Sequence, residues 1–310
     1  MFASLALSLM LLIAPAQAQQ ITPPPPTVPA HETVASVPEG DDIMHHILDE
    51  RVMKVPFAGY VDLPPAGSWM LGPLDITPTK YVIYLWITGL LMLLIFIPAA
   101  RAARRSREGG NSPRGGHNVI EAMVLFFRDQ VVMPNIGHGG EKYVPFVTTL
   151  FFFIAIANLL GLVPYGGAAT ASISVTASFA LLSLIVIEVA GMRALGPVGY
   201  LNTIFYWNKE LPLPMRILLL IILSPVEMLG KLAKPFALAI RLMANMTAGK
   251  IVIYSLIGLI FVFGSWWLIV GPIVMTVALT FLKIFVAFLQ AYIFALLTSV
   301  FIGLIRHAHH

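Results

Sequence analysis

The hydrophobic pattern of the chain divides into four long apolar segments separated by shorter polar ones. Three segments have the length of one bilayer crossing and run from about Thr79 to Ala99, Tyr143 to Pro164 and Ser172 to Met192. A helix that spans the hydrocarbon core needs about 20 apolar residues. The fourth segment, from Leu213 to Arg306, is far longer than one crossing requires and must contain at least two long helices.

The fourth segment contains two groups of helix-breaking residues at which the chain can fold back. They are Phe263-Gly264-Ser265 and Gly271-Pro272. A hairpin here adds two helices to the three earlier ones. The predicted fold class is therefore an all-α integral membrane protein with five transmembrane helices, of which the last two form a long hairpin.

A further segment, NVIEAMVLFFRDQVVM at 118–133, is too polar to cross the membrane and shows helical periodicity. This pattern predicts an amphipathic helix that lies on the cytoplasmic membrane surface. The apolar side chains of one helical face are Ile120, Met123, Val124, Phe127 and Val131, whereas Glu121, Arg128 and Asp129 lie elsewhere.

The N-terminal part of the chain has the features of an exported segment. Residues 1–18 have an apolar centre followed by Ala16-Gln17-Ala18, which is typical of a signal-peptide cleavage site. No basic residue precedes the apolar centre, so an uncleaved membrane anchor is an alternative to a cleaved signal peptide. Residues 19–78 begin with a proline-rich polar stretch and end with a short ordered extracytoplasmic region. The membrane domain follows at 79–306, and 307–310 form a cytoplasmic tail.

Composition and charge agree with the membrane assignment. Of 310 residues, 58% are hydrophobic and 11% charged, with a mean hydropathy of +0.86. The net charge of +4 does not indicate nucleic-acid binding, because the basic residues flank apolar spans. The cluster from Arg101 to Arg107 follows the first span, which places that end in the cytoplasm and the N-terminus outside. Five crossings then place the C-terminus in the cytoplasm. The chain has no cysteine, which excludes disulfides and thiol chemistry.

The first long helix of the hairpin carries a row of polar residues inside an apolar stretch. Their separations of four, three, seven and four residues place them on one helix face, which must meet protein or water because a lipid-facing charge is costly. Lys231 and Lys234 could instead snorkel from a helix end to the surface. The row consists of Glu227, Lys231, Lys234, Arg241 and Asn245.

Arg241 is the most demanding member of this row. Its side chain stays charged at any accessible pH, and an arginine at membrane depth costs about 2.5 to 3.5 kcal/mol. Glu227 is fourteen residues away, or about 20 Å along a helix, so it is out of reach. Arg241 therefore needs a partner on another helix or another subunit. The second hairpin helix offers Lys283 and Gln290 on one face, and Pro235 is expected to bend the first.

The residues around Arg241 resemble a known family. The signature L-x-x-R-L-x-x-N-x-x-x-G is matched, and FLQAYIFALLT follows at 288–298. Both stretches are similar to the a subunit of the F-type ATP synthase membrane sector, and the similarity covers roughly Thr79 to Arg306. The matched signature positions are Leu238, Arg241, Leu242, Asn245 and Gly249.

The resemblance implies a subunit without catalytic activity or cofactor in the inner membrane of a bacterium. Its expected partners are a ring of c subunits, b-type peripheral-stalk subunits and the lipid bilayer, with no nucleic acid. In this family two offset aqueous half-channels lead to carboxylates on the ring, and the arginine separates them. The resemblance assigns that role to Arg241, flanked by Asn245 and Gln290. It places Glu227 in the cytoplasmic half-channel and implies that the two long helices lie strongly tilted.

The chain departs from the family at two positions. Lys250 and Lys283 stand where members commonly have an acidic residue or histidine that relays protons. A desolvated lysine beside another cation can lose its proton, so one of the pair can relay protons as a neutral amine. The alternative is that water and other groups carry the outer half-channel.

Two other function classes compete with the ATP synthase interpretation. A secondary transporter that works alone could use Arg241 to bind an anionic solute, but the paired repeats common in transporters are not visible. An intramembrane hydrolase needs a nucleophile with its base or a metal set, and the spans contain neither. The sequence leaves open whether protons or sodium ions are coupled.

Overall fold

The computed structural model describes most of the chain after residue 51. The predicted signal peptide, the proline-rich stretch and the tail at 307–310 lie outside the described residues. The described residues are 52–55, 59–64, 68, 70–71, 74–75, 77–108, 116–163, 167–205, 212–263 and 266–306.

Helices dominate the membrane domain, and five of those in the described residues are long and apolar enough to cross a membrane. This confirms the predicted fold class. The helical elements are α3 (Lys80–Glu108), α4 (Gly116–Phe126), the π-helix η1 (Phe127–Val132), α5 (Met133–Ile136), the 3-10 turn η2 (Gly140–Lys142), α6 (Val144–Leu162), the 3-10 turn η3 (Ala169–Ala171), α7 (Ile173–Ile204), α8 (Leu213–Phe263) and α9 (Trp266–Arg306).

Two small antiparallel sheets precede the membrane domain, in the part where the sequence predicted a short ordered region. Strand β1 (Val52–Val55) pairs with β2 (Gly59–Asp62), and β3 (Met70–Leu71) pairs with β4 (Leu74–Asp75). Both are local hairpins, so they leave the helical topology of the membrane domain unchanged.

Two of the spans are longer than the hydrophobic pattern indicated. Helix α3 continues past Ala99 through the basic cluster to Glu108, because alanine and arginine are strong helix formers even outside the membrane. Helix α7 continues past Met192 to Ile204, but Gly196 inside it has a left-handed φ of 73°. Glycine adopts this φ without steric cost, so α7 consists of two helical pieces joined at a kink.

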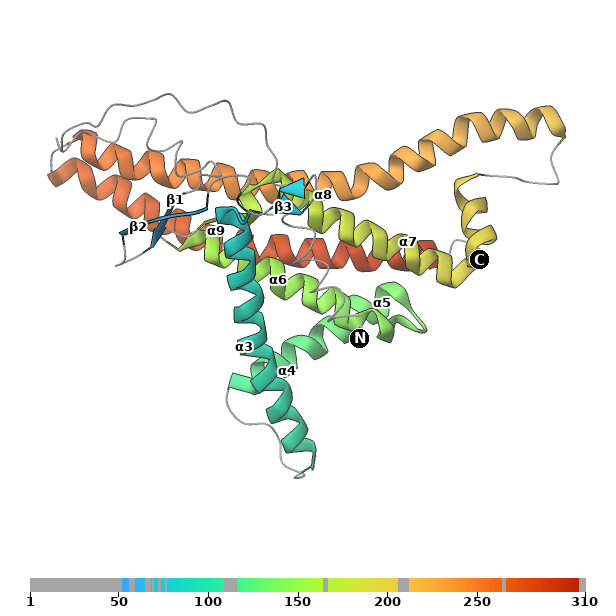
Figure 1. Ribbon diagram of the computed structural model, residues 1–310, viewed down its shortest axis with the longest axis horizontal. Helices are drawn as coiled ribbons and strands as arrows, with labels where there is room; N and C mark the ends of the chain where they lie inside the picture. The colour runs from blue at the N-terminus through green and yellow to red at the C-terminus, as the bar shows by residue number, and fades with distance from the viewer. Residues whose placement is uncertain are drawn as a thin grey trace.

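The last two helices form the predicted hairpin (Figure 1). Helix α8 ends at Phe263 and α9 begins at Trp266, which confirms the first of the two expected turns. The break expected at Gly271-Pro272 is wrong, because Pro272 lies inside α9. A proline removes only one backbone hydrogen bond and its fixed φ is helical, so the helix continues on both sides of it.

Helix α8 contains Pro225 and Pro235 and changes direction along its length (Figure 1). The same view shows α8 and α9 running along the long axis of the molecule, while α3 crosses that direction. The predicted bend of α8 is visible in this arrangement.

Helix α9 is the centre of the packing, in contact with α6, α7 and α8. Its buried face is a row of small residues spaced four apart, which lets neighbouring backbones approach closely in a membrane protein. At the end of the row, a Cβ on Gly303 would collide with the backbone carbonyl of Asn135 in α5. The row consists of Ala287, Ala291, Ala295, Ser299 and Gly303.

The predicted amphipathic segment is helical, and the predicted apolar face points inward. Phe127 and Val131 are fully buried, while Met123 and Val124 pack against the same core. The π-helix leaves the Val131 carbonyl able to accept hydrogen bonds from side chains, and Ser299 Oγ of α9 donates one at 3.2 Å. The second half of this segment is therefore part of the protein core rather than only a surface helix.

The row of small residues can be tested by adding one methyl group. Gly303→Ala places a Cβ against Asn135, so we expect an overpacking penalty of about 1 to 3 kcal/mol and a lower thermal unfolding temperature in detergent. Gly258→Ala in α8 is the matched control, because its Cβ meets no atom within 4 Å. The control should unfold at the wild-type temperature or above it, since alanine favours a helix over glycine. Equal unfolding temperatures for the two variants would contradict the proposed packing.

Candidate functional site

Arg241 lies on the outer face of α8 with its side chain exposed. In the part of the chain that the structure describes, its guanidinium has no hydrogen bond or ion pair. The alanines one and two turns away on the same face are also exposed: Ala237, Ala244 and Ala248. The neighbouring side chains of Leu238 and Leu242 are buried and anchor this turn in the core. The helix thus presents one cation on a narrow, smooth surface.

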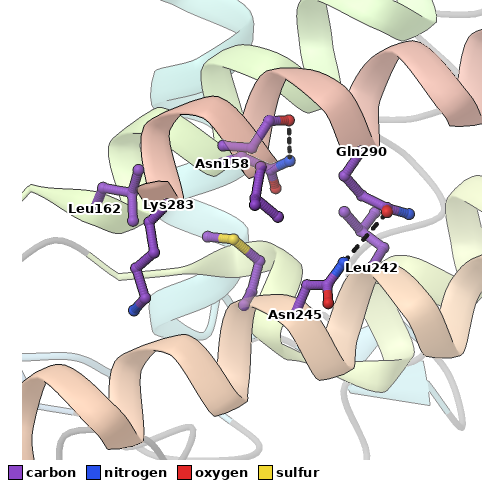
Figure 2. Close-up of a pocket in the computed structure, with 9 residues that line it drawn as sticks. Asn158, Leu162, Leu242, Asn245, Lys283 and Gln290 are labelled. Atoms are coloured by element: carbon purple, nitrogen blue, oxygen red, sulfur yellow. Dashed lines mark hydrogen bonds between the residues drawn. The ribbon is translucent and has the colours of Figure 1, made fainter. Parts of the chain in front are cut away.

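Asn245 and Gln290 connect the two helices of the hairpin next to Arg241. Asn245 Nδ2 donates a hydrogen bond of 3.3 Å to Gln290 Oε1 (Figure 2). Gln290 is only 3% exposed, and its Nε2 is a buried donor without a partner among the described residues. The amide of Gln290 can therefore hydrogen-bond a water molecule or an incoming group.

A small cavity lies beside this pair, between α6, α8 and α9. Its volume is about 20 Å³, which is enough for one water molecule. Lys283 lines it at one end, and Asn245 and Gln290 line it at the other (Figure 2). The cavity therefore lies between the lysine and the amide pair, and Asn158 and apolar side chains form the rest of its lining.

Asn158 of α6 is a member of this site that the sequence prediction did not single out. Its Nδ2 donates to the Ala287 carbonyl of α9 at 3.2 Å, and its Oδ1 accepts from Thr170 Oγ1 of η3 at 2.8 Å. Asn158 and Thr170 are completely buried. The available signal was a lone amide in the middle of a span, which is rare unless it has a structural or functional partner.

The two lysines that depart from the family pattern lie near each other. Lys283 of α9 packs over Gly249 of α8, where a Cβ would collide with the lysine side chain. Lys250 is only 9% exposed, and the charges of Lys80 and Lys283 both act on it. Three lysines from α3, α8 and α9 are therefore close enough to interact electrostatically, and of these Lys283 lines the small cavity.

A second, larger cleft contains the other polar residues of the α8 row. It has a volume of about 140 Å³, enough for several water molecules. Lys231 Nζ donates to Tyr200 Oη of α7 at 3.2 Å, so this lysine points into the protein rather than snorkelling to the surface. Residues from α7, α8 and α9 line the cleft: Leu184, Ile187, Glu188, Thr203, Glu227, Lys231, Lys234, Pro235, Phe301, Leu304 and Ile305.

The structure therefore divides the polar row of α8 into two groups. Glu227, Lys231 and Lys234 line the larger cleft, whereas Asn245 borders the small cavity with Gln290. Arg241 lies between the two groups along the helix and borders neither cavity. The larger cleft also includes Glu188 and Thr203, both of α7.

Comparison with known proteins decides the family. The sequence model of the ATP synthase A chain family matches residues 82–303, which include the small cavity and all but two lining residues of the larger cleft. The chain belongs to this family. It is thus a component of the membrane sector of an ATP synthase, consistent with a non-catalytic subunit, and it is a multi-pass membrane protein.

Similar members of the ATP synthase A chain family come from several bacteria. ATP synthase subunit a 2 of Chlorobaculum tepidum is 41% identical over 266 residues, covering 86% of this chain and 72% of the relative. ATP synthase subunit a of Chloroherpeton thalassium is 40% identical over 274 residues, covering 88% and 79%. The subunit a of Anaeromyxobacter dehalogenans is 38% identical over 281 residues, covering 86% and 71%. Membership in this family argues against a transporter that works alone.

The role of Asn158 in holding this ATP synthase A chain together can be tested directly. Asn158→Leu removes the hydrogen bonds to Thr170 and Ala287, and we expect a loss of about 1 to 2 kcal/mol of stability. The exposed Asn202→Leu variant on α7 is the control and should unfold like the wild type. Thermal unfolding in detergent measures both. A wild-type unfolding temperature for Asn158→Leu would show that these bonds contribute nothing to stability.

Proposed function

We propose that this chain is the proton-conducting stator subunit of a rotary ATP synthase and works against a ring of c subunits. The observation that carries the proposal is the exposed position of Arg241 without a hydrogen-bonding or ionic partner in the described residues. A permanent cation within a membrane-spanning helix is costly unless another group compensates it. A carboxylate on a neighbouring subunit is the group that compensates it best.

The surface around Arg241 supports a partner helix rather than lipid. Exposed alanines on both sides of the guanidinium allow a second helix to approach closely. The stretch of exposed apolar side chains that continues along α8 and α9 suits both lipid and a ring of helices. Examples are Phe236, Ile240, Phe281 and Phe285.

The two cavities supply the half-channels in this proposal. The larger cleft with Glu188 and Glu227 is the cytoplasmic half-channel, and its lysines balance the two carboxylates. The small cavity with Asn245, Gln290 and Lys283 belongs to the outer half-channel. Arg241 separates them, because the two cavities lie on either side of it along α8.

Arg241 then has two physical effects. A ring carboxylate must be protonated to move through lipid, since burial of an isolated charge favours the neutral form. Beside the guanidinium the ionised form is favoured, so the carboxylate releases its proton there. The same charge repels a proton that would otherwise cross directly between the cavities. Such a leak would dissipate a potential worth about 2.3 kcal/mol per charge per 100 mV without turning the ring.

The proposed setting follows from the distribution of basic residues. The cluster at the C-terminal end of α3 is cytoplasmic by the positive-inside rule, so the N-terminus is extracytoplasmic and the C-terminus cytoplasmic. The membrane is the inner membrane of a bacterium. The proposed partners are the c-ring and b-type peripheral-stalk subunits.

Arg241→Ala in membrane vesicles that contain the whole ATP synthase is the primary test. We expect ATP-driven proton pumping to fall to background, because the ring carboxylate no longer meets a compensating charge. Passive proton leak, recorded separately without ATP, should rise. Arg104→Ala at the exposed end of α3 is the matched control and should pump like the wild type. Normal pumping by the Arg241→Ala enzyme would refute the proposal.

The second test addresses the lysine pair, for which we propose a relay role in the outer half-channel. Lys250→Met with Lys283→Met keeps the length of both side chains and removes both titratable amines. We expect proton flux through the complex to decrease by at least tenfold while the assembled complex is still recovered from the membrane. Wild-type flux through the double variant would instead assign the outer path to water and other groups.

A further inference from the structure

A third cavity lies where α9 ends and α6 begins, beside the part of α7 just before its kink at Gly196. It is close to the larger cleft, because Ile305 lines that cleft and its neighbour Arg306 lines this cavity. Its volume is about 170 Å³, and three of its lining residues are cations contributed by three different elements. None of the lining residues is acidic. We refer to this site as the basic pocket, and it is formed by Gly139, Lys142, Tyr143, Ala190, Arg193, Ala194 and Arg306.

Arg306, near the end of α9, is built into the wall of the basic pocket. Its Nη2 donates a hydrogen bond of 2.9 Å to the His138 carbonyl, and its guanidinium lies 5.8 Å from the centre of the Tyr143 ring. Its Nη1 is buried and has no hydrogen-bond partner among the described residues. Arg306 is thus held in place while one N–H group of its guanidinium lacks an acceptor. A buried donor without an acceptor destabilises the protein unless a ligand supplies one.

The loop before α6 is shaped to admit this arginine. Gly139 has a left-handed φ of 78°, and a Cβ there would come within 3.1 Å of Arg306 Nη2. A side chain at this position would therefore push the guanidinium away from the His138 carbonyl. Glycine satisfies both the backbone conformation and the close approach.

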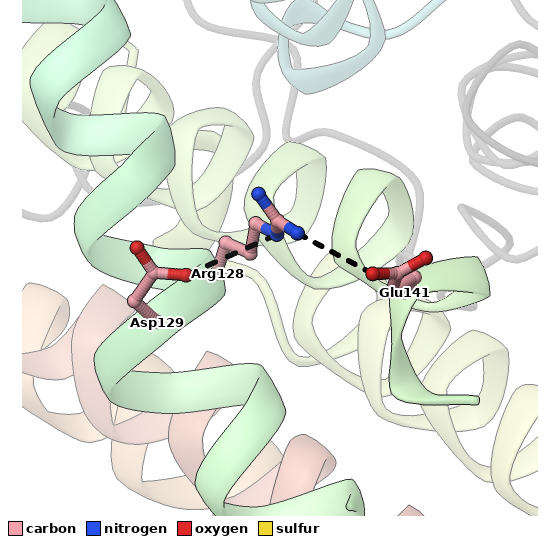
Figure 3. A network of polar contacts seen from close by, with 3 residues as sticks. All are labelled: Arg128, Asp129 and Glu141. Carbon is pink, nitrogen blue, oxygen red and sulfur yellow. Dashed lines mark hydrogen bonds and ion pairs between the residues drawn. The ribbon is translucent and has the colours of Figure 1, made fainter. Parts of the chain in front are cut away.

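The nearest acid in the sequence is kept occupied elsewhere. Glu141 in η2 accepts a hydrogen bond of 3.3 Å from Arg128 Nη2, and Arg128 also lies 3.9 Å from Asp129 (Figure 3). Glu141 does not line the basic pocket, although its neighbour Lys142 does. The positive charge of the pocket is therefore not neutralised by the acid beside it in the chain.

The chemistry of the pocket matches a phosphate group. Guanidinium groups bind phosphate oxygens through paired charge-assisted hydrogen bonds, and a lysine adds a point charge. The volume accommodates a phosphate that replaces several water molecules. Arg193 and Lys142 are exposed, so the site is open to a ligand from outside.

The position of the pocket identifies the source of the phosphate. It lies at the end of the α9 span and the start of the α6 span, beside α7 just before its kink, and the residue next to Arg193 is the exposed apolar Met192. Basic pockets between transmembrane helices bind the head groups of anionic lipids. We propose that the basic pocket binds the phosphate group of an anionic phospholipid at the membrane surface.

The test uses the full-length chain, purified in detergent and stripped of lipid. Dioleoyl-phosphatidylglycerol is titrated at constant ionic strength while the thermal unfolding temperature is measured, because a ligand that binds the native state raises it. Dioleoyl-phosphatidylcholine and inorganic phosphate are titrated in parallel. We expect a saturable rise with the anionic lipid and none with the other two.

The variant Lys142→Gln with Arg193→Gln removes two charges at exposed positions. We expect the lipid concentration at half-saturation to increase by roughly tenfold for each lost contact. Arg101→Gln with Arg104→Gln is the matched control, since it removes two exposed charges from the end of α3 and should keep the wild-type affinity. If the double variant does not fold, Arg193→Gln alone gives the same comparison.

Each outcome decides one part of the proposal. Equal lipid affinities for the pocket variant and the control overturn it. A rise with inorganic phosphate that matches the rise with lipid overturns the lipid source and leaves a soluble phosphate as the ligand. The result is independent of proton pumping, so the assignment of Arg241 can fail while the basic pocket is verified, and the reverse also holds.

Discussion

The close approach of α9 to its neighbours is the constraint on which the rest of the membrane domain depends. Lipid tails are as apolar as the side chains of the helices, so apolar burial does little to drive helices together inside a bilayer. The association of helices must instead be stabilised by close packing of their backbones and by hydrogen bonds between polar groups of different helices. The row from Ala287 to Gly303 provides the first, and the buried amides of Asn158 and Gln290 provide the second.

This constraint also places the functional residues. Gln290 and Lys283 lie on the part of α9 that contacts α8, so the depth at which α9 packs determines how near they come to Asn245 and Gly249. Arg241, one turn before Asn245 on α8, is exposed and is left for a neighbouring subunit in the proposed assembly. A rigid inner face and a chemically active outer face are thus combined in one pair of helices.

The sequence was sufficient for the number of spans, the hairpin turn after Phe263, the inward face of the amphipathic segment and the family. These features depend on periodicity, span length and local motifs, which are read from neighbouring residues. The hydrogen bond from Asn158 to Ala287 joins residues 129 positions apart, and the basic pocket combines a loop with two helix ends. No local pattern encodes such contacts. The break predicted at Gly271-Pro272 was wrong. Glycine and proline show only that a helix is locally less stable there, and the sequence does not show the packing that outweighs this local loss.

The even spacing of the small residues on α9 has a consequence for alignment between helices. Steps of four residues are close to one helical turn, so a slip of α9 by about 6 Å along its axis, four residues at 1.5 Å each, would again set small residues against the same neighbours. Shape alone would tolerate that shift. Two hydrogen bonds oppose this slip: one from Asn158 to the Ala287 carbonyl at the start of the row, and one from Ser299, near its end, to the Val131 carbonyl. Both hydrogen bonds form in only one axial register of α9. They therefore fix which turn of α9 faces which turn of its neighbours.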